Sequence, residues 1–166
     1  MKKYLVIGNP IEHSLSPKLH NFWIKKNNIK AIYEKKKLND DELVDLISKV
    51  KEKKIHGINV TIPFKKNIIP YLDHLTPESH STQSVNTIYL DGDITVGHNT
   101  DIIGFEESIK REKLNISNKK VLILGAGGVV PSIIFALSKM KVSEIIISNR
   151  TKNKAENLKD LFKEIK

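Results

Sequence analysis

The sequence holds a glycine-rich segment, G-A-G-G at Gly125 to Gly128, directly after a predicted strand at 121–124 and before a predicted helix that begins near Val130. In this setting glycines let the backbone approach a pyrophosphate, while the positive end of the helix stabilises the charge of the phosphates. The segment therefore predicts a dinucleotide-binding loop. A plain glycine turn is the alternative interpretation.

The residues that end the next predicted strand bear on the choice of dinucleotide. A site specific for NAD places an acidic residue there, against the ribose hydroxyls, whereas this sequence has Asn149, Arg150 and Thr151. A guanidinium binds a 2′-phosphate through parallel hydrogen bonds, and an aspartate would repel it. The pattern favours NADP, with Arg150 as an ordinary surface residue as the alternative.

Near the N-terminus, Ser14-Leu15-Ser16-Pro17 opens a predicted helix after the first strand. Ser16 fits the N-cap position and Pro17 the first helical position. Two hydroxyls beside the positive end of a helix are suited to a carboxylate. We therefore expect Ser14 and Ser16 to bind a carboxylate, with helix capping alone as the alternative explanation of Ser16.

Further polar residues follow predicted strands, at the edge of an open α/β sheet where ligands bind. They include Asn59 at the carboxyl end of one strand, Thr61 and Lys65 directly beyond it, and Asp101 after a hairpin. The reduction of a ketone needs a proton donor, and an ammonium held by a carboxylate supplies both charge and proton. We predict that Lys65 and Asp101 form this pair. The alternatives are a surface lysine and a helix cap.

The elements that position these residues alternate between apolar runs of strand length and segments with helical periodicity, which predicts an α/β fold with a mostly parallel sheet covered by helices. Strands are expected at 4–7, 31–35, 57–60, 86–90, 94–97, 121–124 and 144–148, and helices at 17–26, 41–53, 103–113, 130–139 and from 152, with helical turns around 64–72 and 77–81. The polar stretch 115–119 separates a domain at 1–114 from a second one at 115–166. The second domain is predicted to be the first half of a Rossmann-type fold.

Composition excludes several functional classes. The chain has 166 residues, a formal net charge of +9 and no cysteine, which excludes a disulfide framework, a thiolate zinc site and a thiol nucleophile. The six histidines show no metal-ligand spacing, so no metal is predicted. The lysines are spread along the chain, which favours small anionic ligands over nucleic acid. With neither a signal-peptide core nor an apolar run of membrane length, we expect a cytoplasmic protein with no membrane contact.

Taken together, the motifs resemble those of the shikimate dehydrogenase family, whose members reduce 3-dehydroshikimate to shikimate with NADPH. The matching motifs are G-N-P-I-x-H-S-x-S-P at 8–17, N-V-T-x-P-F-K at 59–65, V-N-T at 85–87, N-T-D-x-x-G-F at 99–105, G-A-G-G at 125–128 and N-R-T at 149–151. The sequence departs from the family at Gln83 and Ser84, where Gly-Ala is usual, and at Ile102, where a glycine is common.

The resemblance implies a role for each matching residue. Ser14 and Ser16 would bind the substrate carboxylate, and Lys65 would transfer the proton with Asp101 as its partner. The residues implied for the ring hydroxyls are Asn59, Thr61, Asn86 and Asp101. Those implied for NADP are Gly125, Ala126, Gly127, Gly128, Val129, Asn149, Arg150 and Thr151.

The resemblance also implies that the chain stops before the second half of the dinucleotide domain. Because two strands and two helices bury little apolar area, we expect 121–166 to be only marginally stable alone. Its apolar face should then be exposed or paired with another copy of the chain in a homo-oligomer; this face includes Leu158, Leu161, Phe162 and Ile165.

Two functions follow from these observations. The first is NADP-dependent reduction of 3-dehydroshikimate, with a quinate-using relative as a variant of the same chemistry. The second is a truncated, non-catalytic module that binds shikimate or takes part in assembly, because the substrate residues are present while the nicotinamide half of the cofactor site would be missing.

Overall fold

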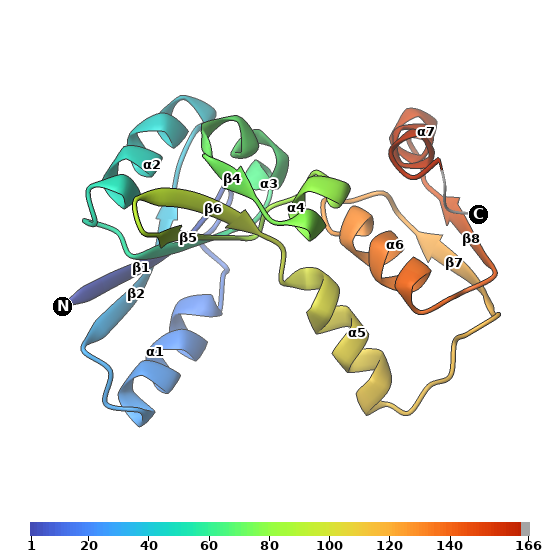
Figure 1. Ribbon diagram of the computed structural model, residues 1–166, viewed down its shortest axis with the longest axis horizontal. Helices are drawn as coiled ribbons and strands as arrows, with labels where there is room; N and C mark the ends of the chain where they lie inside the picture. Colours follow the sequence, from blue (N-terminus) through green and yellow to red (C-terminus); the bar gives the residue numbers. More distant parts are fainter. Residues whose placement is uncertain (164–166) are drawn as a thin grey trace. The chain divides into compact units, whose positions relative to one another are not determined.

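The computed structural model describes residues 1–163 and divides into two compact units. The first unit consists of 1–80 and 85–99, and the second consists of 81–84 and the chain from Thr100 onward. We predicted the domain boundary further along the chain, between 114 and 115. The division falls earlier because helix α5 (Asp101–Arg111) packs against helix α6 (Val130–Lys139) of the second unit (Figure 1).

The first unit is built on a six-stranded sheet in the order β2-β1-β3-β5-β6-β4. Its strands are β1 (Lys2–Gly8), β2 (Ala31–Lys37), β3 (Gly57–Val60), β4 (His74–Leu75), β5 (Thr87–Asp91) and β6 (Ile94–His98). Strand β1 pairs in parallel with β2 and β3, while β5 runs antiparallel to both β3 and β6. The predicted α/β class is confirmed, and β4, which pairs in parallel with β6, is an addition too short to show periodicity.

The helices of this part of the chain are α1 (Ser16–Lys26), α2 (Leu43–Lys51), α3 (Phe64–Asn67) and α4 (Pro77–Thr82). The helical turns predicted around 64–72 are α3 followed by a 3₁₀ turn at Ile69–Tyr71. Pro70 separates them from a continuous α-helix, because its ring lacks the N–H that an α-helix would need at this point. A second 3₁₀ turn, Asp40–Glu42, precedes α2.

The main core lies between the sheet and α2. Leu43, Leu46, Ile47 and Val50 follow helical spacing and are all buried, as expected for the inward stripe of an amphipathic helix. They pack with alternate residues of β1, β3 and β5, among them Leu5, Ile7, Ile58 and Ile88. On the opposite face of the sheet, α1 covers a smaller cluster that includes Val6 and Tyr33 (Figure 1).

The second unit contains a two-stranded parallel sheet formed by β7 (Lys120–Leu124) and β8 (Glu144–Ser148), with α6 and α7 (Lys152–Leu161) packed on one face. Our expectation of an exposed face on the last helix is wrong for Leu158 and Phe162, which are 8% and 9% exposed. These side chains pack against Val130 and Ile134 of α6. Leu161 is exposed as expected, and Ile165 lies outside the described residues.

The exposed apolar surface of the second unit lies instead on its strands. Leu122, Leu124 and Ile146 are 58%, 79% and 47% exposed. Successive side chains of a strand point to opposite faces, so Leu122 and Leu124 share the face of the sheet opposite to Ile123, which belongs to the packed cluster. The apolar surface that we expected on α7 is therefore found across the sheet from it.

Within residues 1–163, no helix has the length and apolar character needed to cross a membrane.

Candidate functional site

The loop after β1, which carries Ser14, and the loop after β3, which carries Thr61, begin side by side. Strands β1 and β3 are paired, and the Thr61 N–H donates to the Ile7 carbonyl at 2.9 Å. One step further, the Asn9 N–H donates to the Ile62 carbonyl at 3.0 Å. Gly8 permits this approach, because a Cβ atom there would lie only 2.6 Å from Thr61 Cγ2. The two loops are thus joined at their start.

A cavity of about 330 Å³ lies where these loops meet. It brings together three of the predicted residues, Ser14, Ser16 and Thr61, and the remaining lining residues are Val6, Pro10, Ile11 and His13. The Ser16 N–H donates to Ser14 Oγ at 3.4 Å. The wall of this cavity therefore combines several hydroxyl groups with apolar side chains.

The structure corrects the predicted capping role of Ser16. Helix α1 already includes Ser16, and the N-cap is Leu15, whose backbone is itself helical at φ −87° and ψ −5°. A side-chain cap requires an extended residue in that position, and Leu15 makes no side-chain cap hydrogen bond. Capping therefore does not explain this serine.

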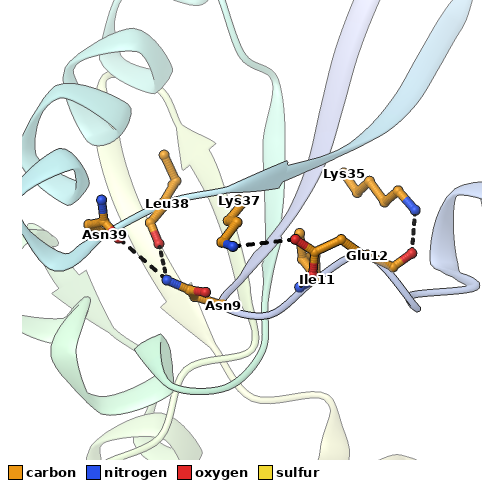
Figure 2. A network of polar contacts seen from close by, with 7 residues as sticks. All are labelled: Asn9, Ile11, Glu12, Lys35, Lys37, Leu38 and Asn39. Carbon is orange, nitrogen blue, oxygen red and sulfur yellow. Dashed lines mark hydrogen bonds and ion pairs between the residues drawn. The ribbon is translucent and has the colours of Figure 1, made fainter.

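The loop before α1 is attached to the end of β2 (Figure 2). The Asn9 side-chain amide donates to the Leu38 carbonyl at 3.2 Å, and Glu12 Oε1 lies 3.5 Å from the Lys37 ammonium. The Lys35 ammonium donates to the Glu12 carbonyl. These contacts come from β2 and the residue that follows it, so they restrain the segment that leads to Ser14.

Glu12 also closes the loop on itself, since its Oε2 accepts the Ile11 N–H at 3.0 Å. Backbone hydrogen bonds from Glu12 and Ile11 lower the pKa of the Glu12 carboxyl, and Lys37 lowers it further. The carboxylate is therefore the form that matches this loop conformation.

The amides predicted to contact a substrate ring lie on neighbouring strands. Asn59 of β3 is half-buried, and Asn86, directly before β5, is 9% exposed. Asn59 Oδ1 accepts the Tyr33 hydroxyl hydrogen at 2.7 Å. Asn59 Nδ2 donates to the backbone carbonyl of Asn86 at 3.3 Å and to Thr87 Oγ1 at 3.2 Å. The Thr87 hydroxyl donates to Asn86 Oδ1 at 3.0 Å. The two amides thus belong to one hydrogen-bonded group.

Tyr33 and Thr87 were not predicted as site residues. Thr87 stands in the V-N-T motif, so its position there was a usable signal. Tyr33 carries no such signal, because its hydroxyl meets a partner 26 residues away in the sequence, and only the parallel pairing of β2, β1 and β3 brings the two together.

Lys65 and Asp101, the predicted catalytic pair, belong to different units. Lys65 lies half-buried in α3 of the first unit, and its carbonyl accepts the Val85 N–H at 2.9 Å, beside the start of β5. Asp101 is the first residue of α5 in the second unit, where Thr100 is the N-cap. The alternative that Asp101 is the cap is therefore wrong, and the pairing of Lys65 with Asp101 stays a prediction.

The predicted cofactor residues all lie after the carboxyl ends of β7 and β8. Gly125 has a φ of +106°, a conformation that favours glycine, and its N–H donates to the Ser148 carbonyl at 2.7 Å. A Cβ atom added to Gly127 would meet no atom within 4 Å. Packing inside the unit thus does not require a glycine at 127.

The side chain of Asn149 braces this loop. Its Oδ1 accepts the Ala126 N–H at 3.1 Å, and its Nδ2 donates to the Thr151 carbonyl at 2.7 Å. Arg150, between these two residues, is exposed. Val129 and Gly128 lead into α6 and are exposed too. The arrangement offers backbone N–H groups at a helix N-terminus beside a single guanidinium, which is the donor set that phosphates require.

Among residues 1–163, the His, Asp and Glu side chains form no group of three that could hold a metal ion.

Comparisons with known proteins agree on one family. The profile of the shikimate dehydrogenase substrate binding domain matches residues 6–88, and that of shikimate / quinate 5-dehydrogenase matches 107–166. The shikimate dehydrogenase (NADP(+)) of Pelagibacter ubique is 57% identical over 99% of this chain, and that of Nitrosopumilus maritimus is 39% identical over 99%. These matches cover 62% and 60% of the two relatives.

Solved structures give the same result. The crystal structure of shikimate dehydrogenase from Aquifex aeolicus matches with a TM-score of 0.91 and 39% identity, over 98% of this chain and 61% of that one. The enzyme from Thermus thermophilus in complex with NADP(H) and shikimate matches with a TM-score of 0.88 and 31% identity, over 98% and 61% of the two chains. The chain thus spans about three fifths of the length of these relatives.

Proposed function

Since this chain belongs to the shikimate dehydrogenase family, we propose that it binds shikimate through its first unit and NADP through its second, and that the protein interconverts 3-dehydroshikimate and shikimate. The observation that carries the proposal is the cavity lined by Ser14, Ser16 and Thr61, together with the two hydrogen-bonded amides of the same unit. A ring that bears one carboxylate and several hydroxyls matches such a set of donors and acceptors.

The carboxylate of the substrate takes its hydrogen bonds from Ser14 and Ser16. Each hydroxyl has one hydrogen to donate, and the positive end of α1 adds a favourable field for an anion. Thr61, Asn59 and Asn86 then face the ring hydroxyls. Hydrogen bonds of hydroxyls and amides to a substrate of this kind set its orientation as well as its affinity, because a missing partner leaves a desolvated polar group.

Lys65 handles the proton of the reaction. The glycine loop and Arg150 would hold NADPH, which would supply the hydride for reduction of the ketone carbon. As negative charge develops on the carbonyl oxygen, the Lys65 ammonium donates a proton to it, and Asp101 stabilises the charged form of the lysine. In the reverse direction the neutral amine accepts the hydroxyl proton of shikimate.

The second unit is suited to NADP. The open space above Gly127 lets a phosphate approach the backbone, and Val129 is the N-cap of α6, whose N-terminus would face that charge. Arg150 is placed one residue after Asn149, at the strand end where a 2′-phosphate is recognised. We propose that Arg150 gives NADP its advantage over NAD.

Steady-state assays of shikimate-dependent NADPH formation test the proposal, together with calorimetric titration of shikimate. We expect the Lys65→Ala variant to lose about a hundredfold or more in turnover, while its affinity for shikimate falls far less. Lys66→Ala removes the exposed neighbouring lysine and is the matched control. Equal turnover in the two variants would contradict the role of Lys65.

The same assays separate the proposed enzyme from a non-catalytic module. If the 166-residue chain binds shikimate but forms no NADPH, the module is supported for this chain instead. Parallel assays with quinate decide between the two substrates. Association of two copies through the second unit also stays a prediction, which sedimentation velocity would test.

A further inference from the structure

A continuous chain of hydrogen bonds crosses three strands of the first unit. It begins at the Tyr33 hydroxyl in β2, passes through the Asn59 amide in β3 and the Thr87 hydroxyl in β5, and ends at the side chain of Asn86. The distances along it are 2.7, 3.2 and 3.0 Å. All four residues are buried or half-buried, so water competes weakly for these bonds.

The Asn59 amide can take only one orientation in this chain. The backbone carbonyl of Asn86 lies 3.3 Å from Asn59 Nδ2. A backbone carbonyl can only accept a hydrogen. The amide nitrogen of Asn59 must therefore face it, which turns Oδ1 toward Tyr33 and makes the tyrosine hydroxyl the donor. Asn59 Nδ2 also donates to Thr87, so the single hydrogen of the Thr87 hydroxyl is directed to Asn86 Oδ1.

This direction determines what each amide can offer. Both hydrogens of the Asn59 amide are used inside the sheet, so Asn59 can meet a ligand only as an acceptor through the second lone pair of Oδ1. Asn86 Oδ1 accepts the Thr87 hydroxyl hydrogen, and the amide nitrogen is the only donor group of the Asn86 side chain. The chain thus limits Asn59 to accepting and orients Asn86 so that its amide nitrogen can donate.

The first member of the chain is itself held firmly. Tyr33 is 4% exposed, and the Asn21 side chain bonds both its N–H, at 3.0 Å, and its carbonyl, at 2.7 Å. The His20 ring stacks on the tyrosine ring, with centroids 4.1 Å apart and planes within 4°. Burial raises the pKa of the Tyr33 hydroxyl well above its usual value, so it is a protonated donor throughout the neutral range.

We propose that Tyr33 and Thr87 are positioning residues, which fix Asn59 as a hydrogen-bond acceptor and Asn86 as a hydrogen-bond donor toward the hydroxyls of the substrate ring. This inference rests on the proposed binding of shikimate to the first unit. It adds that the ring must offer a hydroxyl hydrogen to Asn59 and a hydroxyl oxygen to Asn86.

Two substitutions of one residue test the proposal most directly. Thr87→Val removes the hydroxyl at nearly constant shape, and Thr87→Ser keeps it. We expect Thr87→Val to weaken calorimetric binding of shikimate about tenfold, the usual result of losing one hydrogen bond, and Thr87→Ser to bind within about twofold of the unchanged chain. Tyr33→Phe should resemble Thr87→Val, with Tyr89→Phe, on the exposed Tyr89 of β5, as its control. Equal binding by the valine and serine variants would overturn the proposal.

A second readout needs no ligand. In ¹⁵N-labelled chain, Tyr33→Phe should shift the side-chain amide resonances of Asn59 and Asn86, while most backbone resonances stay in place. An unmoved Asn86 side-chain resonance would overturn the inference even if the fold is intact. If the unchanged chain binds no shikimate, the proposed function fails in calorimetry, and the resonance shifts still decide whether the directional chain exists.

Discussion

The two units present their candidate binding groups in different ways. In the first, side chains from several strands are tied to one another, as in the group formed by Asn59, Asn86 and Thr87. In the second, the groups aimed at a phosphate are backbone N–H groups, and one side chain, Asn149, braces them. The first surface depends on side-chain identity, while the second depends on backbone conformation.

The cores differ in the same sense. The sheet of the first unit has buried side chains on both faces, such as Ile7 on one and Val6 on the other. The sheet of the second unit has a packed face and a face where Leu122 and Leu124 are exposed. Removing a strand side chain should therefore have consequences that depend strongly on the unit.

The largest expected effect tests the difference between the cores. Leu46 in α2 is 1% exposed, and Leu122 in β7 is 58% exposed. We expect Leu46→Ala to lower the free energy of unfolding by about 2–5 kcal/mol, because it leaves a cavity, and Leu122→Ala to change it by less than about 0.5 kcal/mol. Urea unfolding measures both. Similar losses would show that the exposed strand face is packed in solution.

The next effect compares two glycines. A Cβ atom at Gly8 would lie 2.6 Å from Thr61 Cγ2 and 3.0 Å from the Ile62 carbonyl, whereas one at Gly127 would meet open space. Gly8→Ala should therefore cost about 1–3 kcal/mol of stability. Gly127→Ala should leave stability within about 0.5 kcal/mol and weaken NADP binding, because the methyl group occupies the space of the phosphate. Unchanged NADP binding by Gly127→Ala would remove Gly127 from the site.

The response to pH separates the units by direction. Hydrogen bonds from Lys51, then from the Thr95 backbone and side chain, hold the pKa of the Asp73 carboxyl in the first unit well below its usual value. A lowered folded-state pKa stabilises the fold above the unfolded value of about 3.8, and this stabilisation is lost as pH falls through the folded value. Asp73→Asn should therefore flatten the fall in Tm between neutral and acid pH.

In the second unit the stability changes with pH in the opposite direction, because Glu144 raises the pKa of Lys120. A raised lysine pKa stabilises the fold below its unfolded value, and this effect is lost as pH rises through the folded value. Lys120→Met should thus alter the alkaline limb of the Tm profile and leave the acid limb unchanged. If Asp73→Asn leaves the fall in Tm at acid pH unchanged, the assignment of that fall to Asp73 is contradicted.

The smallest expected effect concerns the loop before α1, which leads to Ser14 and is restrained by Glu12 and Asn9 (Figure 2). Glu12→Gln removes the charge that faces Lys37 but keeps an oxygen for the Ile11 N–H, whereas Glu12→Ala removes both. Exposed ion pairs contribute little, so we expect the glutamine variant to bind shikimate as the unchanged chain does. The alanine variant should bind about two- to threefold more weakly. Equal weakening would mean that charge, and not loop geometry, matters.

Much of the fold could be predicted from periodicity. The helical stripe from Leu43 to Val50 and the apolar strand at 57–60 are local patterns, and the structure reproduces both. The helical turns at 64–72 were predicted as well, and Pro70 is the local reason that they do not form one α-helix. By contrast, two-residue β4 exists only because β6 lies beside it, and no local pattern reveals it.

The candidate site likewise has residues that local sequence predicts and others that it does not. Ser14 and Thr61 could be predicted from short motifs, and the structure brings them to one cavity. The cap position at the start of α1 depended on the backbone angles of Leu15, which residue types alone do not determine. The contact between Tyr33 and Asn59 depends on strand pairing across β1, so it had to come from the three-dimensional arrangement.

The neighbouring residues Asn149 and Arg150 divide two tasks that are often combined in one residue. Asn149 keeps the glycine loop in shape through its contacts with Ala126 and Thr151, while Arg150 extends into solvent. Redesign of coenzyme preference could therefore vary position 150 freely, since the architecture of the loop is maintained by the residue before it.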